Sequence, residues 1–313
     1  MTSPERLIEQ GIGETRVVLV EGNDIVEARI MRDGVTPAGT VLTAQLIATG
    51  RNAVARADGQ EYLLPKGAPG VTQGARLNIE ITREALAGSE PWKRPLARAS
   101  DAPAGPPPAP DGEMLSLVAP SDALDAMGWS DLLDEARSGI IAFPGGELRV
   151  SVTPAMTLID VDGNLPPEPL ALAGAKAAAR AIRRHGIGGS IGIDLPTIGG
   201  KTARQTVAEA VDAILPQPFE RTAVNGFGFL QIVRPRRHAS LFELASDRAA
   251  FEARALLRRA AREVGNVTLV ANPALLAALQ QGWTEQLARQ IGGTVTLRAE
   301  PSLAMSAAYA QRS

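Results

Sequence analysis

The chain has 313 residues, of which 45% are hydrophobic and 21% are charged, and its formal net charge is -2 at pH 7. This size and composition are typical of a globular protein with two or three domains. The small net charge argues against a surface that binds polyanions everywhere, although it leaves room for a local basic groove. The absence of cysteine excludes disulfides and cysteine zinc sites, and two histidines disfavour a histidine-dominated metal site. We therefore expect any metal to be bound by oxygen, as Mg²⁺ or Mn²⁺ prefers.

The sequence also indicates where the protein is located. No stretch approaches the roughly 18 apolar residues of a membrane span. The first residues, 1–9, lack the apolar core that follows basic residues in a signal peptide. We therefore expect no membrane span and a cytoplasmic location.

Strand patterns dominate the first hundred residues. Two β-branched runs flank the turn residues 21–24 and predict a β-hairpin over 16–30. Short strands separated by glycine-rich turns are then expected at 39–47, 52–56, 61–64 and 75–82. A spacing of about ten residues favours a small barrel, and an OB-type barrel fits the length.

The only aromatic side chain in these barrel strands is Tyr62, with Arg51 and Arg56 near it in sequence. OB-type barrels bind single-stranded nucleic acid by stacking bases on aromatic side chains in a basic groove. This makes Tyr62 a candidate RNA-binding residue. The alternative is that Tyr62 packs inside the barrel.

A proline-rich segment over 98–111 cannot bury a core and is expected to be an extended linker. After it, the pattern predicts a strand at 114–119 and a helix at 122–137. Residues 140–152 are expected to form a hairpin that turns at Pro144-Gly145-Gly146.

The centre of the chain holds two short apolar runs that end in aspartates, one over 156–162 and one over 190–195. An alanine-rich helix is expected between them at 170–184, ending at a glycine stop. The separation of Asp160 and Asp194 suits two parallel strands joined by a crossover helix, which would place both carboxylates at the same sheet end. Such a pair could bind Mg²⁺, with Asp162 as a third ligand. Asp160, Asp162 and the glycine after them also fit an ordinary strand-to-turn signal.

Basic residues follow the second aspartate. A helix is predicted at 201–214 and carries Lys201 and Arg204 near its start, and Asn225-Gly226 predicts a hairpin turn. Lys201, Arg204, Arg234 and Arg236 are candidates to hold backbone phosphates. The arginines in the helices at 170–184 and 247–264 fit solvated helix faces instead.

The last part alternates helices and strands, as in α/β layers. We expect helices at 247–264 and 273–291, strands at 267–271 and 294–298, and a loosely held tail at 304–313. The sequence alone therefore indicates an α/β protein with a candidate oxygen-ligand metal site.

Several motifs together resemble the ribonuclease E/G family. Residues 143–162 resemble the family segment in which a Pro-x-Gly-Gly hairpin and a strand lead to the first catalytic aspartate, and 188–194 resemble the strand that presents the second. Residues 227–236 are similar to the family's Phe-Gly-Leu-x-Glu-Met-x-Arg-x-Arg motif. Upstream, 15–22 and 62–65 resemble its opening strand pair and its OB barrel. The shared order of these motifs covers nearly the whole chain.

The resemblance implies an α+β multi-subdomain fold. It comprises a ribonuclease-H-like layer (1–35 and 112–142), an inserted OB-type barrel (36–97), the linker (98–111), a deoxyribonuclease-I-like catalytic subdomain (143–240) and a small α/β subdomain (247–313). It also implies Mg²⁺-dependent endonucleolytic cleavage of single-stranded RNA, leaving a 5′-phosphate on the downstream product. By this match Asp160 and Asp194 are carried over as catalytic metal ligands.

Departures from the family pattern are equally specific. The linker stands where family members place a sensor subdomain for the RNA 5′-monophosphate, so loss of 5′-end sensing is expected. Without cysteine, the family's zinc link between protomers cannot form, and any oligomer would be held without zinc. The family's asparagine after the first aspartate is Asp162 here, the acid after the second is Thr197, and the arginine before Phe-Gly is Gly226.

These patterns lead to one preferred function and two alternatives. The preferred function is a metal-dependent endoribonuclease of RNA processing or decay. The first alternative is a catalytically impaired descendant of the same scaffold that binds RNA or a protein partner. The second is a metal-dependent phosphodiesterase that acts on a small nucleotide.

Overall fold

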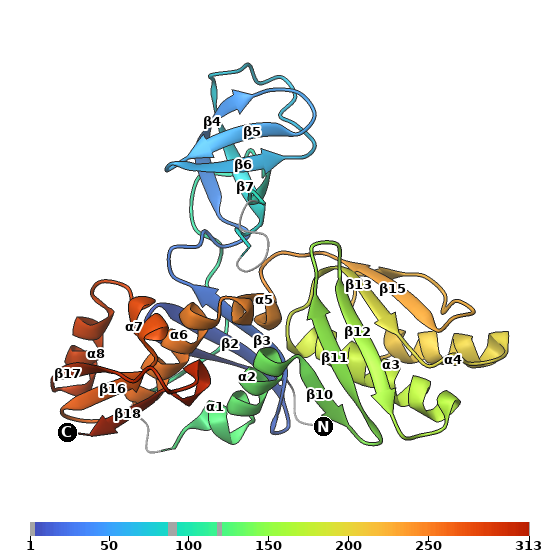
Figure 1. Cartoon of the computed structure of the whole chain (residues 1–313). Coiled ribbons are helices and arrows are strands. Elements are labelled where there is room, and N and C mark those ends of the chain that lie inside the picture. The colour runs from blue at the N-terminus through green and yellow to red at the C-terminus, as the bar shows by residue number, and fades with distance from the viewer. Residues whose placement is uncertain (1–3, 87–92, 118–120, 313) are drawn as a thin grey trace. The chain divides into compact units, whose positions relative to one another are not determined.

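The computed structural model describes residues 4–86, 93–117 and 121–312 and has a mixed α+β fold (Figure 1). Contacts divide the chain into two compact units. Unit 1 comprises Met1–Asp33, Pro110–Leu133 and Leu244–Ser313, and unit 2 comprises Gly34–Ala109 and Asp134–Glu243. Each unit is therefore assembled from segments that are far apart in sequence.

A four-stranded sheet of order β3-β2-β1-β9 forms the first layer of unit 1. The predicted hairpin is confirmed, since β2 (Glu14–Glu21) pairs with β3 (Asp24–Arg32) in antiparallel fashion. The sequence analysis missed β1 (Glu5–Gln10), whose middle residues are buried. The predicted strand at 114–119 is shorter, because β9 comprises only Glu113–Leu115 and pairs in parallel with β1. Residues 118–120 of that prediction lie outside the described residues.

Two of the predicted helices are divided where a glycine adopts a positive φ angle. The helix expected at 122–137 is two helices, α1 (Ala123–Ala126) and α2 (Trp129–Ser138), separated at Gly128 with φ +88°. The helix expected at 273–291 is likewise α7 (Pro273–Ala277) and α8 (Trp283–Ile291), with Gly282 at φ +85° between them. A left-handed backbone conformation ends an α-helix, so both single-helix predictions were wrong.

The three-stranded sheet of unit 1 has the order β17-β16-β18. The predicted strands are confirmed as β16 (Val267–Ala271) and β17 (Val295–Ala299), which pair in parallel. The tail expected to be loosely held instead forms η1 (Met305–Ala307) and β18 (Tyr309–Arg312), which pairs with β16. The sheet packs with α6 (Arg248–Ala260), and one core joins it to Ile12 and Leu117 of the other segments of unit 1.

Unit 2 contains a closed barrel of order β4-β5-β6-β8-β7 (Figure 1), which is consistent with the predicted OB type. Its strands are β4 (Val41–Ala48), β5 (Ala53–Ala57), β6 (Gln60–Leu64), β7 (Arg76–Arg83) and β8 (Leu96–Ala99). The first four match the predicted strands. The fifth, β8, includes the first two residues of the predicted linker, so the barrel extends further than expected.

Unit 2 also contains a six-stranded sheet of order β10-β11-β12-β13-β15-β14 (Figure 1). Its strands are β10 (Ile140–Phe143), β11 (Gly146–Val152), β12 (Thr157–Gly163), β13 (Gly189–Asp194), β14 (Glu220–Arg221) and β15 (Phe229–Arg234). Only β12 and β13 run parallel, and α3 (Pro167–Arg184) connects them as predicted. The Pro-Gly-Gly hairpin is also confirmed. It places β10 in this sheet, although residues 140–142 were expected in the ribonuclease-H-like layer.

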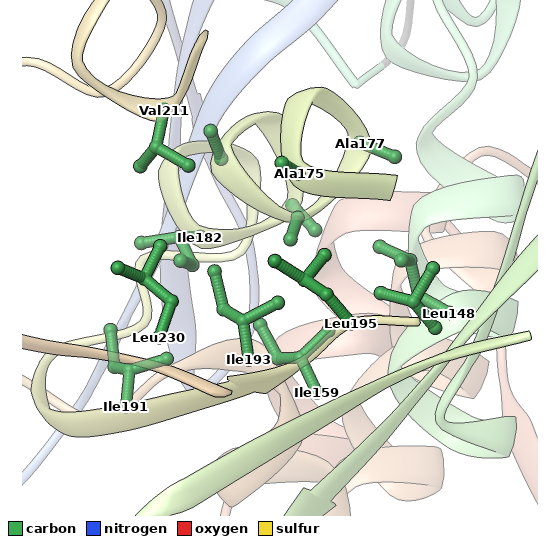
Figure 2. Packing of buried hydrophobic residues seen from close by; sticks show 14 of the residues in the cluster. Leu148, Ile159, Ala175, Ala177, Ile182, Ile191, Ile193, Leu195, Val211 and Leu230 are labelled. Atoms are coloured by element: carbon green, nitrogen blue, oxygen red, sulfur yellow. The ribbon is translucent and has the colours of Figure 1, made fainter. Parts of the chain in front are cut away.

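One face of this sheet packs on α3 and α4 (Lys201–Asp212). Every second residue of the strands is buried there, and Figure 2 shows Ile159, Ile191, Ile193 and Leu230 pointing towards α3. Small side chains on α3, among them Ala171, Ala175 and Ala178, leave room for these larger strand residues. Because side chains alternate along a strand, the residues between them point to the other side. We call this side the open face.

Candidate active site

The two aspartates of the central strands lie next to each other on the open face. Asp160 and Asp194 are direct register partners at the ends of the parallel strands β12 and β13. Their neighbours Ile159 and Ile193 are completely buried on the helix face, while both aspartates are exposed. The strand alternation that fixes this core therefore also places the two carboxylates side by side, as the sequence predicted.

A row of side chains crosses the sheet through this pair. Arg149 of β11 is the register partner of Asp160, and Phe229 of β15 is the register partner of Asp194. Arg149 also places its Nε 3.6 Å from Oδ2 of Asp162 and forms an ion pair with Glu147. The row thus consists of a guanidinium, two carboxylates and an aromatic ring, in that order.

An apolar surface adjoins the carboxylates on the next row of the open face. Gly192 lies between Leu158 and Phe229, and a Cβ atom at Gly192 would lie 2.5 Å from Cζ of Phe229 and 3.0 Å from Cδ2 of Leu158. Glycine at this position therefore allows the Phe229 ring to lie against the sheet. The ring and Leu158 form an apolar border next to the aspartate pair on the open face.

The acidity of Asp160 reflects these surroundings. Partial burial has the largest effect and raises the pKa of Asp160, because desolvation disfavours the carboxylate. The nearby Asp162 and Asp194 carboxylates raise this pKa further, whereas a hydrogen bond from the Val161 amide and the charge of Arg149 act in the opposite direction. Negative charge is therefore concentrated where the strands end, and a bound cation would relieve it.

The donor set fits a two-carboxylate site. Within residues 4–86, 93–117 and 121–312, no three His, Cys, Asp or Glu side chains are grouped so that they could hold a metal ion. Asp162, the predicted third ligand, lies close to Arg149, and its charge also acts on Asp160. Mg²⁺ commonly takes only one or two protein carboxylates and keeps several waters, so Asp160 and Asp194 suffice as its protein ligands.

A surface hollow of about 490 Å³ lies beside this pair, at the same end of β12. It is lined by Glu147, Arg149 and Asp162, together with the turns at 145–146 and 163–164. Three of these positions are glycines, Gly145, Gly146 and Gly163, at each of which neighbouring atoms leave no room for a Cβ atom. The hollow shares Arg149 with the row of side chains that contains Asp160.

The predicted phosphate-binding residues lie in two separate places. Lys201 and Arg204 begin α4 directly after the loop that follows Asp194, and Arg204 supports this loop through a hydrogen bond from Nη1 to the Ile198 carbonyl (3.5 Å). Lys201 is exposed. These two residues therefore lie at the same end of the sheet as the aspartate pair.

Arg234 and Arg236 lie at the opposite end of β13. The register partner of Arg234 is Gly189, five positions before Asp194, which corresponds to about 17 Å along the strand. Arg234 donates to the Ile187 carbonyl (3.4 Å), and Arg236 forms an ion pair with Glu243. These arginines are not adjacent to the aspartate pair and could contact only a more distant phosphate.

Tyr62 does not have the position that base stacking requires. It is 2% exposed inside the barrel, and its hydroxyl lies 3.3 Å from that of Thr36. The predicted RNA-binding role of Tyr62 was wrong, because the ring fills the barrel core next to Leu64. This outcome matches the alternative interpretation given above, in which Tyr62 is a packing residue.

Sequence reasoning missed three residues around the aspartates, namely Arg149, Phe227 and Phe229. Arg149 and Phe229 could have been found by counting the register outward from the turns that join β11 to β12 and precede β15. Phe227 could not have been found in this way, because its exposure depends on the shape of the turn. All three lie at or near the end of the sheet that carries Asp160 and Asp194.

Comparisons with known proteins give no further identification. A scan against protein-family models finds no matching model, and a search of curated proteins finds no match. Among the described residues, no helix is long and apolar enough to cross a membrane. The functional assignment therefore rests on the site itself.

Proposed function

We propose that the protein is a metal-dependent endoribonuclease that cleaves single-stranded RNA on the open face of the six-stranded sheet. The observation that carries the proposal is the direct register of Asp160 with Asp194 at an exposed strand end. In this reaction a P–O bond forms to a water oxygen and the bond to the 3′-oxygen breaks. The products are a downstream RNA with a 5′-phosphate and an upstream RNA with a 3′-hydroxyl.

Asp160 and Asp194 would hold the cation, Mg²⁺ or Mn²⁺. When bound there, the cation supplies positive charge and lowers the pKa of water, which is the chemistry that phosphodiester hydrolysis needs. The raised pKa of Asp160 supports this role, because its causes include two neighbouring carboxylates that a cation would offset.

Other residues of the site would bind and orient the RNA. Lys201 is exposed at the start of α4 and would donate to a backbone phosphate next to the cleaved bond. Arg149 neutralises part of the carboxylate charge from the other side of Asp160. Leu158 and Phe229 form the apolar border next to the pair. Arg234 and Arg236 would contact a phosphate further along the strand.

The finer fold assignment belongs to the same proposal. We propose that the closed barrel is of the OB type and that the six-stranded sheet is deoxyribonuclease-I-like, within a ribonuclease E/G-like chain. The parallel β12–α3–β13 unit and the Pro-Gly-Gly hairpin support this assignment. The barrel would then position RNA through its surface charges rather than through Tyr62.

A cleavage assay tests the function directly. Purified protein is incubated with a 5′-labelled single-stranded RNA in Mg²⁺, and the Asp160→Asn and Asp194→Asn variants are compared with wild type. We expect either substitution to abolish cleavage, because the cation would lose one of the two carboxylates that fix its position next to the phosphate. Asp101→Asn is the matched control, since Asp101 is an exposed carboxylate elsewhere in unit 2, and it should cleave normally.

The assay also separates the alternatives. Cleavage that persists in Asp194→Asn, or in the presence of a chelator, would contradict the assignment. RNA binding without cleavage by the wild-type protein would support the impaired RNA-binding descendant. Competition by mononucleotides or dinucleotides would instead identify a small-nucleotide phosphodiesterase.

A further inference from the structure

An exposed aromatic ring stands at the end of the sheet that carries the aspartates. Phe227 is 84% exposed and lies in the turn that leads into β15. Phenylalanine is among the residues most often found fully buried. Its closest sequence neighbours, Gly226 and Gly228, provide no side chain that covers the ring.

Hydrogen bonds fix the backbone beneath this ring. Oδ1 of Asn225 accepts from the amides of Phe227 (2.9 Å) and Phe229 (3.0 Å). The Asn225 amide donates to the Phe229 carbonyl (3.0 Å), and the Gly228 amide donates to the Asn225 carbonyl (3.2 Å). The turn is therefore closed by its own side chain as well as by its backbone, and the ring starts from a fixed position.

The same turn is bonded to the loop that follows Asp194. Thr197 donates from Oγ1 to the Phe227 carbonyl (3.3 Å), and the Leu195 amide donates to the Gly228 carbonyl (3.2 Å). Gly228 has φ +93°, and a Cβ atom there would lie 2.1 Å from the Leu195 carbonyl oxygen. Only glycine permits this close approach. The position of Phe227 is thus coupled to that of Asp194.

Phe227 lies about one nucleotide away from the carboxylate pair. Phe229 is the register partner of Asp194, and Phe227 lies two residues before Phe229, in the turn that leads into β15. Two residues span at most about 7 Å even when extended, and the turn makes the distance shorter, so Phe227 lies within about the length of one nucleotide unit of Phe229. A strand of RNA whose phosphate is at the aspartates would therefore bring an adjoining base to the ring.

We propose that Phe227 is a positioning residue that stacks on an unpaired base next to the scissile phosphodiester. This inference rests on the proposed function. Stacking on an aromatic ring tolerates every base, since each has a π-face, and it requires a single strand. Because the turn is already ordered, little conformational entropy is lost when the base binds.

A protein partner fits this ring less well than a base. The core of a protein interface is a contiguous apolar group. The neighbours of Phe227 on its turn, Asn225, Gly226 and Gly228, are polar or lack a side chain, and the apolar surface formed by Leu158 and Phe229 adjoins two carboxylates. The adjoining carboxylates and Lys201 are suited to a metal ion and a phosphate.

Binding is measured first, without divalent metal so that no RNA is cleaved. The probe is a single-stranded oligoribonucleotide of mixed sequence, and the proteins are wild type, Phe227→Ala, Phe227→Leu and Phe227→Trp. We expect Phe227→Ala and Phe227→Leu to bind about 10-fold more weakly, within the range that loss of one stacked base gives. Val264→Ala is the control, since Val264 is 69% exposed in unit 1, and it should bind as wild type does.

Fluorescence provides a readout that does not depend on catalysis. The indole introduced by Phe227→Trp should be quenched when the oligoribonucleotide stacks on it, beyond any change in the wild-type protein, which has three tryptophans. A blunt duplex RNA should give no such quenching. Unchanged affinity of Phe227→Ala together with absence of quenching would overturn the inference.

An abasic scan locates the stacked base. RNAs that lack one base at successive positions are cleaved by wild type and by Phe227→Ala. At one position next to the cleaved bond, loss of the base should slow wild type about 10-fold and leave Phe227→Ala unchanged. Additive effects at every position would refute stacking. Quenching in a protein that cleaves no RNA would uphold stacking and reject only the endoribonuclease assignment.

Discussion

Replacing Glu9 with glutamine should destabilise unit 1 strongly, because Glu9 is the centre of a buried charge network. Its Oε1 accepts from Arg16 Nη1 (2.8 Å) and Arg258 Nε (2.7 Å), and its Oε2 accepts from Arg258 Nη2 (3.0 Å). The side chains of Glu9, Arg16 and Arg258 are 2%, 1% and 5% exposed. Burial alone would lower the pKa of Arg258, yet Glu9 and Asp122 hold it above its usual range.

The expected loss in the free energy of unfolding depends on the charges that stay buried when Glu9 is replaced. Removing one partner of a buried ion pair typically costs about 3–5 kcal/mol, since the other charge stays buried without compensation. Here Arg16 keeps Glu14 as a partner (2.7 Å) and Arg258 keeps Asp122 (2.6 Å). We therefore expect a loss in the free energy of unfolding near the lower end, about 3 kcal/mol.

Urea unfolding measures this loss. In a Trp92→Phe background the remaining tryptophans, Trp129 and Trp283, both belong to unit 1, so their fluorescence reports that unit. The matched control is Glu263→Gln in the same unit, which removes the charge of the surface pair between Glu263 and Arg312.

The control should cost less than about 1 kcal/mol, because the Arg312 side chain is 70% exposed. A cost below 1 kcal/mol for Glu9→Gln, or equal costs for both variants, would refute the reasoning.

Three further changes test the site and the barrel. Without divalent metal, Asp160→Asn should unfold at a higher temperature than wild type, because the ionised carboxylate is disfavoured only in the folded state. This difference in thermal midpoint should grow as the pH rises from the ordinary pKa of 3.8 through the raised pKa of Asp160. Added Mg²⁺ should raise the midpoint of wild type alone. Gly192→Ala should displace Phe229 and cost about 1–3 kcal/mol of stability, measured by thermal unfolding, and a cost near zero would contradict the close contact. Tyr62→Phe should cost about 1 kcal/mol and leave RNA affinity unchanged in a filter-binding assay, whereas weaker binding would restore an RNA contact at Tyr62.

The local patterns predicted much of the fold wherever one physical rule dominated. The Pro144-Gly145-Gly146 turn and the alternation of buried residues around Asp160 and Asp194 identified the central strands and their parallel connection. Strand alternation also predicts that Tyr62 is buried, because Tyr62 points to the same side of its strand as Leu64. Tyr62 was predicted to bind RNA because of the chemistry of its ring, without regard to the side of the strand on which it lies.

Other features depend on contacts that no local pattern contains. The residues of β8 were assigned to the linker because prolines flank them, and pairing with β7 is what makes them a strand. The tail forms β18 only because β16 offers it an edge. The separation of Arg234 from the aspartates became visible only with the register of β13 and β15. The local patterns thus identified basic residues near the site, but they did not show which of them lie close to the aspartates.

The divided chain of unit 1 sets an order of events during synthesis. The barrel strands all lie within 41–99, so the barrel can close as soon as this contiguous stretch has been made. Glu9, by contrast, meets Arg258 across 249 positions of sequence. On the growing chain Glu9 can pair with Arg16 early, but it lacks its second arginine until α6 emerges. The four-stranded sheet of unit 1 therefore completes its interior last, although three of its four strands are made before the barrel.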